Sequence, residues 1–213
     1  MSAVASLPLA ALLATSSAAT AVNSADKMAM AFGHCLVERS DERALLNVLD
    51  QPFPTVATGK ALGGFINAAC LPKRGPNFRS SLIGMRKLLY NALYLKKFGH
   101  IALDLIPSQP LSYPLASDVP ELAGQKNYRE ATILGDCVVR ASPKDARALV
   151  LTEVGSYQEG TAFNALMPTL KGCVIEGQQT PVEMQAVRLV ISEPLFRMTE
   201  LQERRRMAQE TVH

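Results

Sequence analysis

A repeat at a spacing of about 102 residues constrains this chain more than any other feature of its sequence. Several short blocks of the first part reappear in the same order in the second part, with shifts of at most two residues. The paired blocks are 32–37 with 134–139, 41–46 with 145–150, Cys70 with Cys173, 85–89 with 187–191, and 93–94 with 195–196. Ordered matches of this kind indicate duplication. The sequence therefore predicts two homologous units, over residues 22–98 and 126–213.

The composition predicts that both units are helical. Hydrophobic residues make up 48% of the chain and charged residues 19%, which is typical of a globular protein with a real core. The chain has no Trp, and only 6% of its residues are aromatic. Because strands favour aromatic and β-branched residues, this balance favours an all-α fold. We expect about four helices in each unit.

Capping residues predict where several helices begin. The expected starts are Ser24 for the first helix, Ser40 with the acidic Asp41 and Glu42 for the second, Ser142-Pro143 for its counterpart in unit two, and the capping box Thr180-Pro181-Val182-Glu183 for the last helix. The third helix of each unit should end near its second cysteine, Cys70 or Cys173. Pro194 should kink the last helix.

The segment 99–125 is predicted to be an extended connector between the units. It carries Pro107, Pro110, Pro114 and Pro120 and shows no helical period. Proline removes a backbone donor and restricts the residue before it, so such a segment does not sustain a helix.

The amino-terminal segment 1–21 has the pattern of a secretory signal peptide. An apolar run extends from Val4 to Ala14, shorter than the ~20 residues of a membrane-spanning helix. Ala19-Thr20-Ala21 then matches the small-residue cleavage pattern, although no Lys or Arg precedes the apolar run. An uncleaved anchor and a disordered Ala/Ser-rich tail are the alternatives. Export predicts a periplasmic or secreted protein without a transmembrane span.

The four cysteines fall one pair to a unit, Cys35 with Cys70 and Cys137 with Cys173. Four cysteines allow three connectivities, of which duplication favours the two within-unit disulfides. Zinc sites commonly pair ligands two to four residues apart, and the chain has no C-x-x-C and only three His, so we expect no metal site. A redox couple needs C-x-x-C and haem attachment needs C-x-x-C-H, and the chain contains neither motif. A catalytic thiol is disfavoured by the apolar surroundings of each cysteine.

These features together resemble a known group of proteins. Gly-x-Cys followed by Leu-Val or Val-Val, a second cysteine about 35 residues later, and an Arg-containing apolar helix ending in Leu-Tyr or Leu-Phe are similar to uncharacterised exported proteins of alphaproteobacteria. The resemblance covers both units. It implies export and duplication, and it implies no activity, ligand or catalytic residue.

Basic residues concentrate in the first unit. Between Gln51 and Leu103 the chain has eight Lys and Arg and no acid, whereas the whole chain carries a net charge of +3. An anionic partner such as a lipid headgroup is one interpretation, and a solvated face that meets acids of unit two is the other. The candidate anion-binding residues are Arg74, Arg79, Arg86, Lys87 and Arg188.

Arg86 and Arg188 occupy matching places inside apolar helices. An unpaired guanidinium there would be costly, so each should contact a carboxylate or helix-end carbonyls. The alternative is that both face a shared groove between the units and bind an anionic ligand.

We recognise no nucleophile elbow, zinc-protease, phosphate-loop or dinucleotide motif, so no catalytic residue and no cofactor is predicted. The first hypothesis is an exported, non-catalytic protein that binds an unknown protein partner or contributes to an envelope assembly, possibly as a homo-oligomer. The second is binding of an anionic lipid or small ligand, through the basic surface of unit one or the groove. An enzyme of another kind is the third. Nucleic acid is not expected as a partner.

Overall fold

The computed structural model describes residues 14–71, 80–101, 111–115, 125–174 and 183–210, and the side chains from Ser24 onward. The described part contains eight α-helices and one 3-10 helix, which confirms the all-α prediction. No helix among these residues is long and apolar enough to cross a lipid bilayer. The predicted signal segment lies mostly in 1–13, outside the described residues.

The first half of the molecule comprises α1 to α4. Its elements are α1 Ala14–Arg39, α2 Glu42–Leu49, α3 Val56–Gly63, the 3-10 helix η2 Ala68–Cys70, and α4 Leu82–Phe98. α1 begins at Ala14, so the expected start at Ser24 is wrong. α2 is capped by Asp41, which accepts from the Ala44 N–H at 2.7 Å, whereas the Ser40 hydroxyl donates to the Leu36 carbonyl within the last turn of α1.

The second half comprises α5 to α8. Its elements are α5 Gln125–Ala141, α6 Pro143–Leu151, α7 Tyr157–Cys173 and α8 Met184–Glu210. α6 begins with Pro143 after Ser142, as predicted, but the Ser142 hydroxyl bonds to Asp145 and caps no backbone N–H. The predicted capping box lies mostly outside the described residues. α8 is assigned as one helix through Pro194.

The third helix differs between the halves. α7 runs unbroken to Cys173, as predicted. α3 ends at Gly63, and Cys70 lies in η2, so the prediction of one helix reaching Cys70 is wrong. The Gly63-Gly64 pair explains the early end, because glycine lowers helix stability by about 1 kcal/mol relative to alanine.

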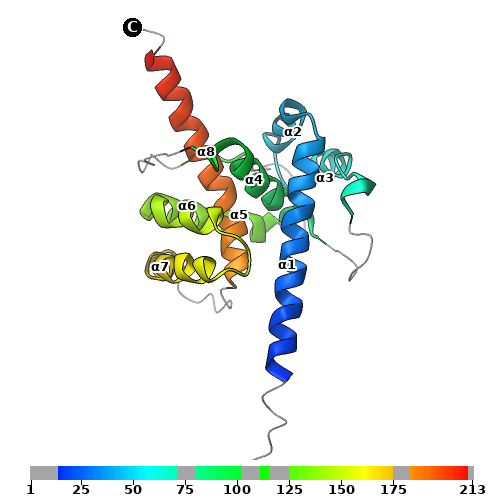
Figure 1. Ribbon diagram of the computed structural model, residues 1–213. Coiled ribbons are helices and arrows are strands. Elements are labelled where there is room, and N and C mark those ends of the chain that lie inside the picture. Colours follow the sequence, from blue (N-terminus) through cyan, green and yellow to red (C-terminus); the bar gives the residue numbers. More distant parts are fainter. Residues whose placement is uncertain (1–13, 72–79, 102–110, 116–124, 175–182, 211–213) are drawn as a thin grey trace, which may run out of the picture.

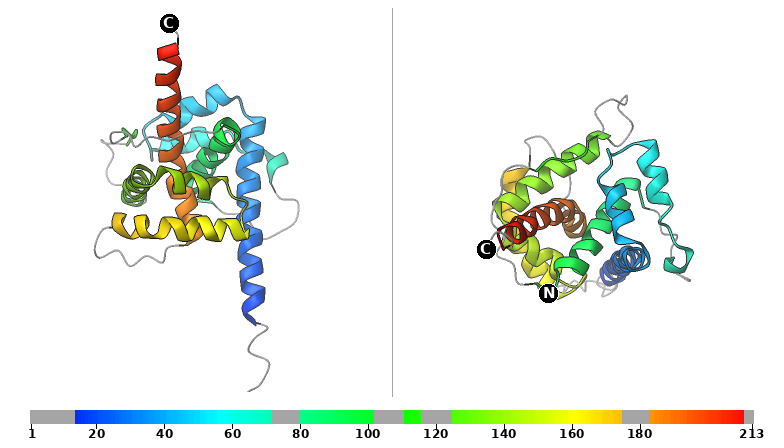
Figure 2. Two further views of the ribbon diagram at one scale, coloured as in Figure 1. Left: turned by 60° about the vertical axis from the view of Figure 1, so that its left-hand side comes forward. Right: turned by 90° about the horizontal axis from the view of Figure 1, so that it is seen from above.

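α4 and α8 form the centre of the molecule. They contact each other, α1 packs on α4, and α5 packs on α8 (Figure 1). Every residue of α4 from Met85 to Tyr94 is buried. The amino-terminal end of α1 and the carboxy-terminal end of α8 extend beyond this core in opposite directions (Figure 2).

Two glycines allow the outer helices to approach the central ones. A Cβ at Gly33 of α1 would lie 3.1 Å from the Leu88 carbonyl oxygen of α4. A Cβ at Gly135 of α5 would overlap the Val190 carbonyl oxygen of α8. An alanine at Gly135 would force the two backbones apart, whereas one at Gly33 would need a shift of a few tenths of an ångström, so the closer contact depends more on its glycine.

The described part of the connector, 111–115, contacts both halves. The Phe53 N–H donates to the Pro114 carbonyl at 2.8 Å, which forms an isolated bridge to the first half. The Tyr113 hydroxyl donates to Asp136 of α5 at 2.9 Å. These contacts help to join the two halves into one body.

Candidate functional site

Each half contains one disulfide, which links two of its helices. Cys35 of α1 is bonded to Cys70 of η2, and Cys137 of α5 is bonded to Cys173 at the end of α7. The predicted pairing is therefore confirmed, and none of the four thiols is free. Paired disulfides of this kind are typical of proteins that fold in an oxidising compartment.

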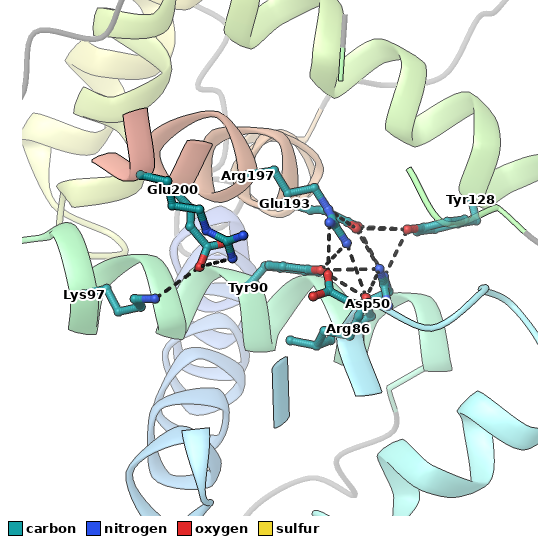
Figure 3. A network of polar contacts seen from close by, with 10 residues as sticks. Asp50, Arg86, Tyr90, Lys97, Tyr128, Glu193, Arg197 and Glu200 are labelled. Atoms are coloured by element: carbon teal, nitrogen blue, oxygen red, sulfur yellow. Dashed lines mark hydrogen bonds and ion pairs between the residues drawn. The ribbon is translucent and has the colours of Figure 1, made fainter. Parts of the chain in front are cut away.

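Arg86 of α4 lies in a buried polar cluster between the halves (Figure 3). Its guanidinium forms an ion pair with Glu193 of α8 at 2.8 Å and donates to the Leu49 carbonyl at the end of α2 at 2.7 Å. Its Nε also donates to the Tyr128 hydroxyl at 3.0 Å, and its Cζ lies 4.9 Å from the centroid of the Phe53 ring. The side chain therefore has both kinds of partner expected from the sequence, a carboxylate and a helix-end carbonyl.

Glu193 is the acceptor that joins this cluster. Its carboxylate is fully buried and accepts from Arg86, from Tyr128 at 3.0 Å and from Arg197 at 3.2 Å. Burial by itself would raise the pKa of Glu193, but the charges of Arg86 and Arg197 outweigh burial and lower it. Arg197 continues the network to Asp50 at 3.1 Å, close to the surface.

Arg188 of α8 forms the corresponding buried pair in the second half. It contacts Glu159 of α7 at 2.6 Å and donates to the Val150 carbonyl in the last turn of α6 at 2.9 Å. Glu159 also accepts from the Gln185 amide at 2.6 Å. Burial lowers the pKa of Arg188, and Glu159 offsets only part of this effect.

Lys87 is buried beside the Arg86 cluster without a hydrogen-bond acceptor for its Nζ among the described residues. The amine lies 5.7 Å from the centroid of the Tyr128 ring. Burial lowers the pKa of Lys87 to about 8, against the opposing attraction of Glu193. A buried amine of this kind is costly in its charged form.

A groove of about 430 Å³ opens between the two halves. Its described lining comes from one face of α1, from α4, from the α6–α7 turn and from α8. The lining residues are Lys27, Met30, His34, Asn91, Leu95, Leu151, Thr152, Glu153, Val154 and Arg188. Four of the ten lining side chains are apolar and six carry hydrogen-bonding groups, so the groove offers both kinds of contact to a ligand.

The charges around the groove are paired with each other. Arg188 is neutralised by Glu159 behind it, and Lys27 contacts Glu153 across the groove at 3.3 Å. Burial lowers the pKa of His34, which favours the neutral imidazole, although Glu38 acts in the other direction. The Thr152 hydroxyl donates to the Leu149 carbonyl and accepts from Arg188. No nucleophile and base are hydrogen-bonded to each other among these described lining residues.

The structure separates the five candidate anion-binding residues. Arg74 and Arg79 lie outside the described residues. Arg86 and Lys87 are buried, so they do not form a basic surface. Arg188 lines the groove but Arg86 is not among its lining residues, so the structure does not place both arginines in one groove.

Two other basic residues of the first half pair with acids, of which only Glu200 lies in the second half. Lys97 contacts Glu200 of α8 at 3.4 Å and Glu42 of α2 at 3.6 Å. Lys96 contacts Glu38 of α1 at 3.7 Å.

Sequence reasoning offered a groove between the units as an alternative, but it missed Glu193, Glu159 and most of the residues that line the groove. Both acids carried a usable signal, because each lies on a buried face of its helix where an unpaired carboxylate would be costly. The lining residues had no such signal, because they come from segments far apart in the chain. Within the described residues, no group of three or more His, Cys, Asp or Glu is placed to hold a metal ion.

Comparison with family models, with curated proteins and with solved structures finds no match to this chain.

Proposed function

We propose that this chain is an exported, non-catalytic binding protein that holds a small, largely apolar ligand in the groove between its halves. The observation that carries the proposal is the groove itself, about 430 Å³ in volume and lined by both halves. A volume within ~300–1,000 Å³ is typical of small-molecule sites.

Export is supported by the two disulfides, by the apolar segment that precedes Ala21, and by the resemblance to exported proteins. All four cysteines are used in bridges within their own halves. A periplasmic or secreted location follows from the proposal.

Duplication of one helical unit is supported by contacts that recur in both halves. Each half has a disulfide from its first helix, over sequence separations of 35 and 36 residues. Each half also has a glycine of the first helix packed against a backbone carbonyl of the fourth. The groove then lies between two related units, where binding sites are often found.

The paired charges favour an uncharged ligand over the anion considered from the sequence. An anion bound to Arg188 would compete with Glu159, which already contacts that guanidinium at 2.6 Å. Removing a buried arginine from its acid costs about 3–5 kcal/mol. The exposed pair Lys27–Glu153 is worth about 1 kcal/mol or less, so it presents little barrier to ligand entry.

Binding of Nile red, an uncharged apolar dye, tests the proposal. We expect one saturable site with enhanced dye emission. Leu95→Trp places an indole in the groove and should weaken dye binding at least about tenfold by steric exclusion. Ile133→Trp adds the same ring to an exposed position on α5 and is the matched control.

Native mass spectrometry of protein recovered from its host supplies a second measurement. A small molecule that copurifies with the wild type and with Ile133→Trp, but not with Leu95→Trp, would identify the ligand. Equal dye binding by the wild type and Leu95→Trp would contradict the groove as the binding site.

A further inference from the structure

Four large apolar side chains are exposed between residues 56 and 82, at one edge of the first half. The exposed fraction is 78% for Val56, 48% for Ile66, 43% for Leu71 and 45% for Leu82. Single exposed apolar residues are ordinary on protein surfaces, whereas a group of them indicates a contact surface. This surface is separate from the groove, since none of the four residues lines it.

Gly59 allows Leu82 to pack on the side of α3 that also carries Val56. Val56, Gly59 and Gly63 share one side of α3 because residues three and four apart are neighbours on a helix. A Cβ at Gly59 would lie 2.7 Å from a methyl group of Leu82, so the leucine lies directly over this glycine. Lys60, one turn after Val56, is also exposed.

We define the α3 face as Val56, Lys60, Ile66, Leu71 and Leu82. The Cys35–Cys70 disulfide fixes η2, next to Leu71, onto α1. α3 and η2 lie at the edge of the molecule away from α6 and α7 (Figures 1 and 2). The body of the second half therefore leaves this edge accessible.

The charged residues of the segment 51–82 are all basic. Residues 51–82 contain four Lys and Arg and no acid. The corresponding stretch of the second half, 153–184, contains Glu153, Glu159, Glu176, Glu183 and a single Lys171. Tyr157 occupies the place of Val56 there, since each is the first residue after a helix cap, and it is 87% exposed. The exposed apolar residues of 56–82 are thus accompanied in the sequence by basic residues and no acid, whereas Tyr157 lies two residues from Glu159 and four from Glu153.

We propose that the α3 face docks this protein on an anionic phospholipid surface. Apolar side chains on such a face enter the boundary between headgroups and acyl chains, while lipid phosphates attract the exposed Lys60. An anionic surface fits better than a protein groove because it satisfies the positive charge as well as the apolar area. The proposal does not depend on ligand binding in the groove.

Cosedimentation of the full chain with vesicles tests the proposal. The probe is vesicles of equal parts phosphatidylglycerol and phosphatidylcholine, compared with pure phosphatidylcholine. We expect binding to the anionic vesicles that falls when salt is raised, and much weaker binding to the neutral ones. The double variant Val56→Ser/Leu82→Ser should partition at least about tenfold less, because two apolar side chains no longer leave water. Lys60→Gln should lower partition about fivefold.

Tyr157→Ser is the matched control, because it removes an exposed apolar residue at the corresponding place in the second half. It should bind vesicles like the wild type. Circular dichroism confirms that each variant is folded, and sedimentation velocity reports self-association. The proposal would be overturned if the wild-type protein does not bind anionic vesicles. A wild-type dimer that the double variant abolishes would also overturn it, because the α3 face would then bind a second copy of this chain.

Discussion

The two buried arginines occupy matching places in the predicted repeat but take their acids from different places. Each donates to a main-chain carbonyl in the last turn of the second helix of its own half. Arg188 is neutralised by Glu159 of the same half, whereas Arg86 is neutralised by Glu193 of the other half. A buried guanidinium thus needs a carboxylate but does not fix where in the chain that carboxylate lies.

The cause of the difference is visible at the start of the third helix. Glu159 lies three residues after the capping Ser156, and its backbone N–H donates to the Ser156 hydroxyl. The residue three positions after the capping Thr55 is Thr58, whose hydroxyl donates to the Pro52 carbonyl. With no acid at this place, the first half depends on α8 for its counter-charge. The Arg86–Glu193 pair therefore joins the halves, and the Arg188–Glu159 pair does not.

Glu193→Gln should give the largest loss of stability. The substitution leaves Arg86 buried without its acid and also removes a partner of Arg197. We expect a loss of about 5 kcal/mol in the free energy of unfolding, measured by urea denaturation. Glu200→Gln on the same helix is the control, since it removes only partly exposed ion pairs, to Lys97 and to Arg204, and should cost about 1 kcal/mol or less. Similar losses in the free energy of unfolding for Glu193→Gln and Glu200→Gln would contradict a special role for the buried Arg86–Glu193 pair.

Glu159→Gln should cost less, about 3 kcal/mol. Arg188 keeps its bonds to the Val150 carbonyl and to Thr152, and only one arginine loses its acid. The same urea measurement ranks this variant against Glu193→Gln. A larger loss for Glu159→Gln would show that the pair within the second half, and not the pair between halves, dominates.

Gly135→Ala should destabilise more than Gly33→Ala, although both glycines permit a helix contact. An alanine Cβ at Gly135 would overlap the Val190 carbonyl oxygen, whereas at Gly33 it would lie 3.1 Å from the Leu88 carbonyl oxygen. We expect about 2 kcal/mol for Gly135→Ala and about 1 kcal/mol for Gly33→Ala. Thermal unfolding of the two variants checks the order, and the reverse order would contradict it.

The smallest expected effect is a change of stability with pH, and it is caused by Lys87. Its place in the predicted repeat is taken by Leu189 in the second half. Because burial lowers the pKa of Lys87 to about 8 from its usual 10.5, the unfolded chain binds more protons above pH 8 than the folded chain. The free energy of unfolding should therefore rise by about 1 kcal/mol between pH 8 and 9.

The variant Lys87→Leu should lose this rise and be more stable than the wild type at pH 7. Urea denaturation at each pH provides the measurement. The range ends at pH 9 because burial raises the pKa of Tyr128 above its usual value, and unfolded tyrosines begin to titrate near pH 10. If the free energy of unfolding rises as much between pH 8 and 9 in Lys87→Leu as in the wild type, a group other than Lys87 causes the rise.

Local features of the sequence predicted much of the fold. The pairs Cys35–Cys70 and Cys137–Cys173 were predicted correctly because the predicted repeat reduced the possible connectivities, and Ser142-Pro143 placed the start of α6 because proline favours the first turn of a helix. The start of α1 was missed because the predicted signal segment was separated from the helix that follows it. The particular residues that contact Arg86 and that line the groove were missed because they depend on how α4 packs on α8, and helix periodicity does not specify that arrangement.

Hydrogen exchange of the folded protein tests most directly whether the Arg86–Glu193 pair stabilises both halves while the Arg188–Glu159 pair stabilises only its own. In Glu193→Gln, we predict faster amide exchange in α4 and in α8, because the contact between halves is weakened. In Glu159→Gln, we predict faster exchange in α7 and the start of α8, with α1 and α4 as protected as in the wild type. Identical exchange patterns in the two variants would contradict the claim that Arg86 and Glu193 hold the halves together.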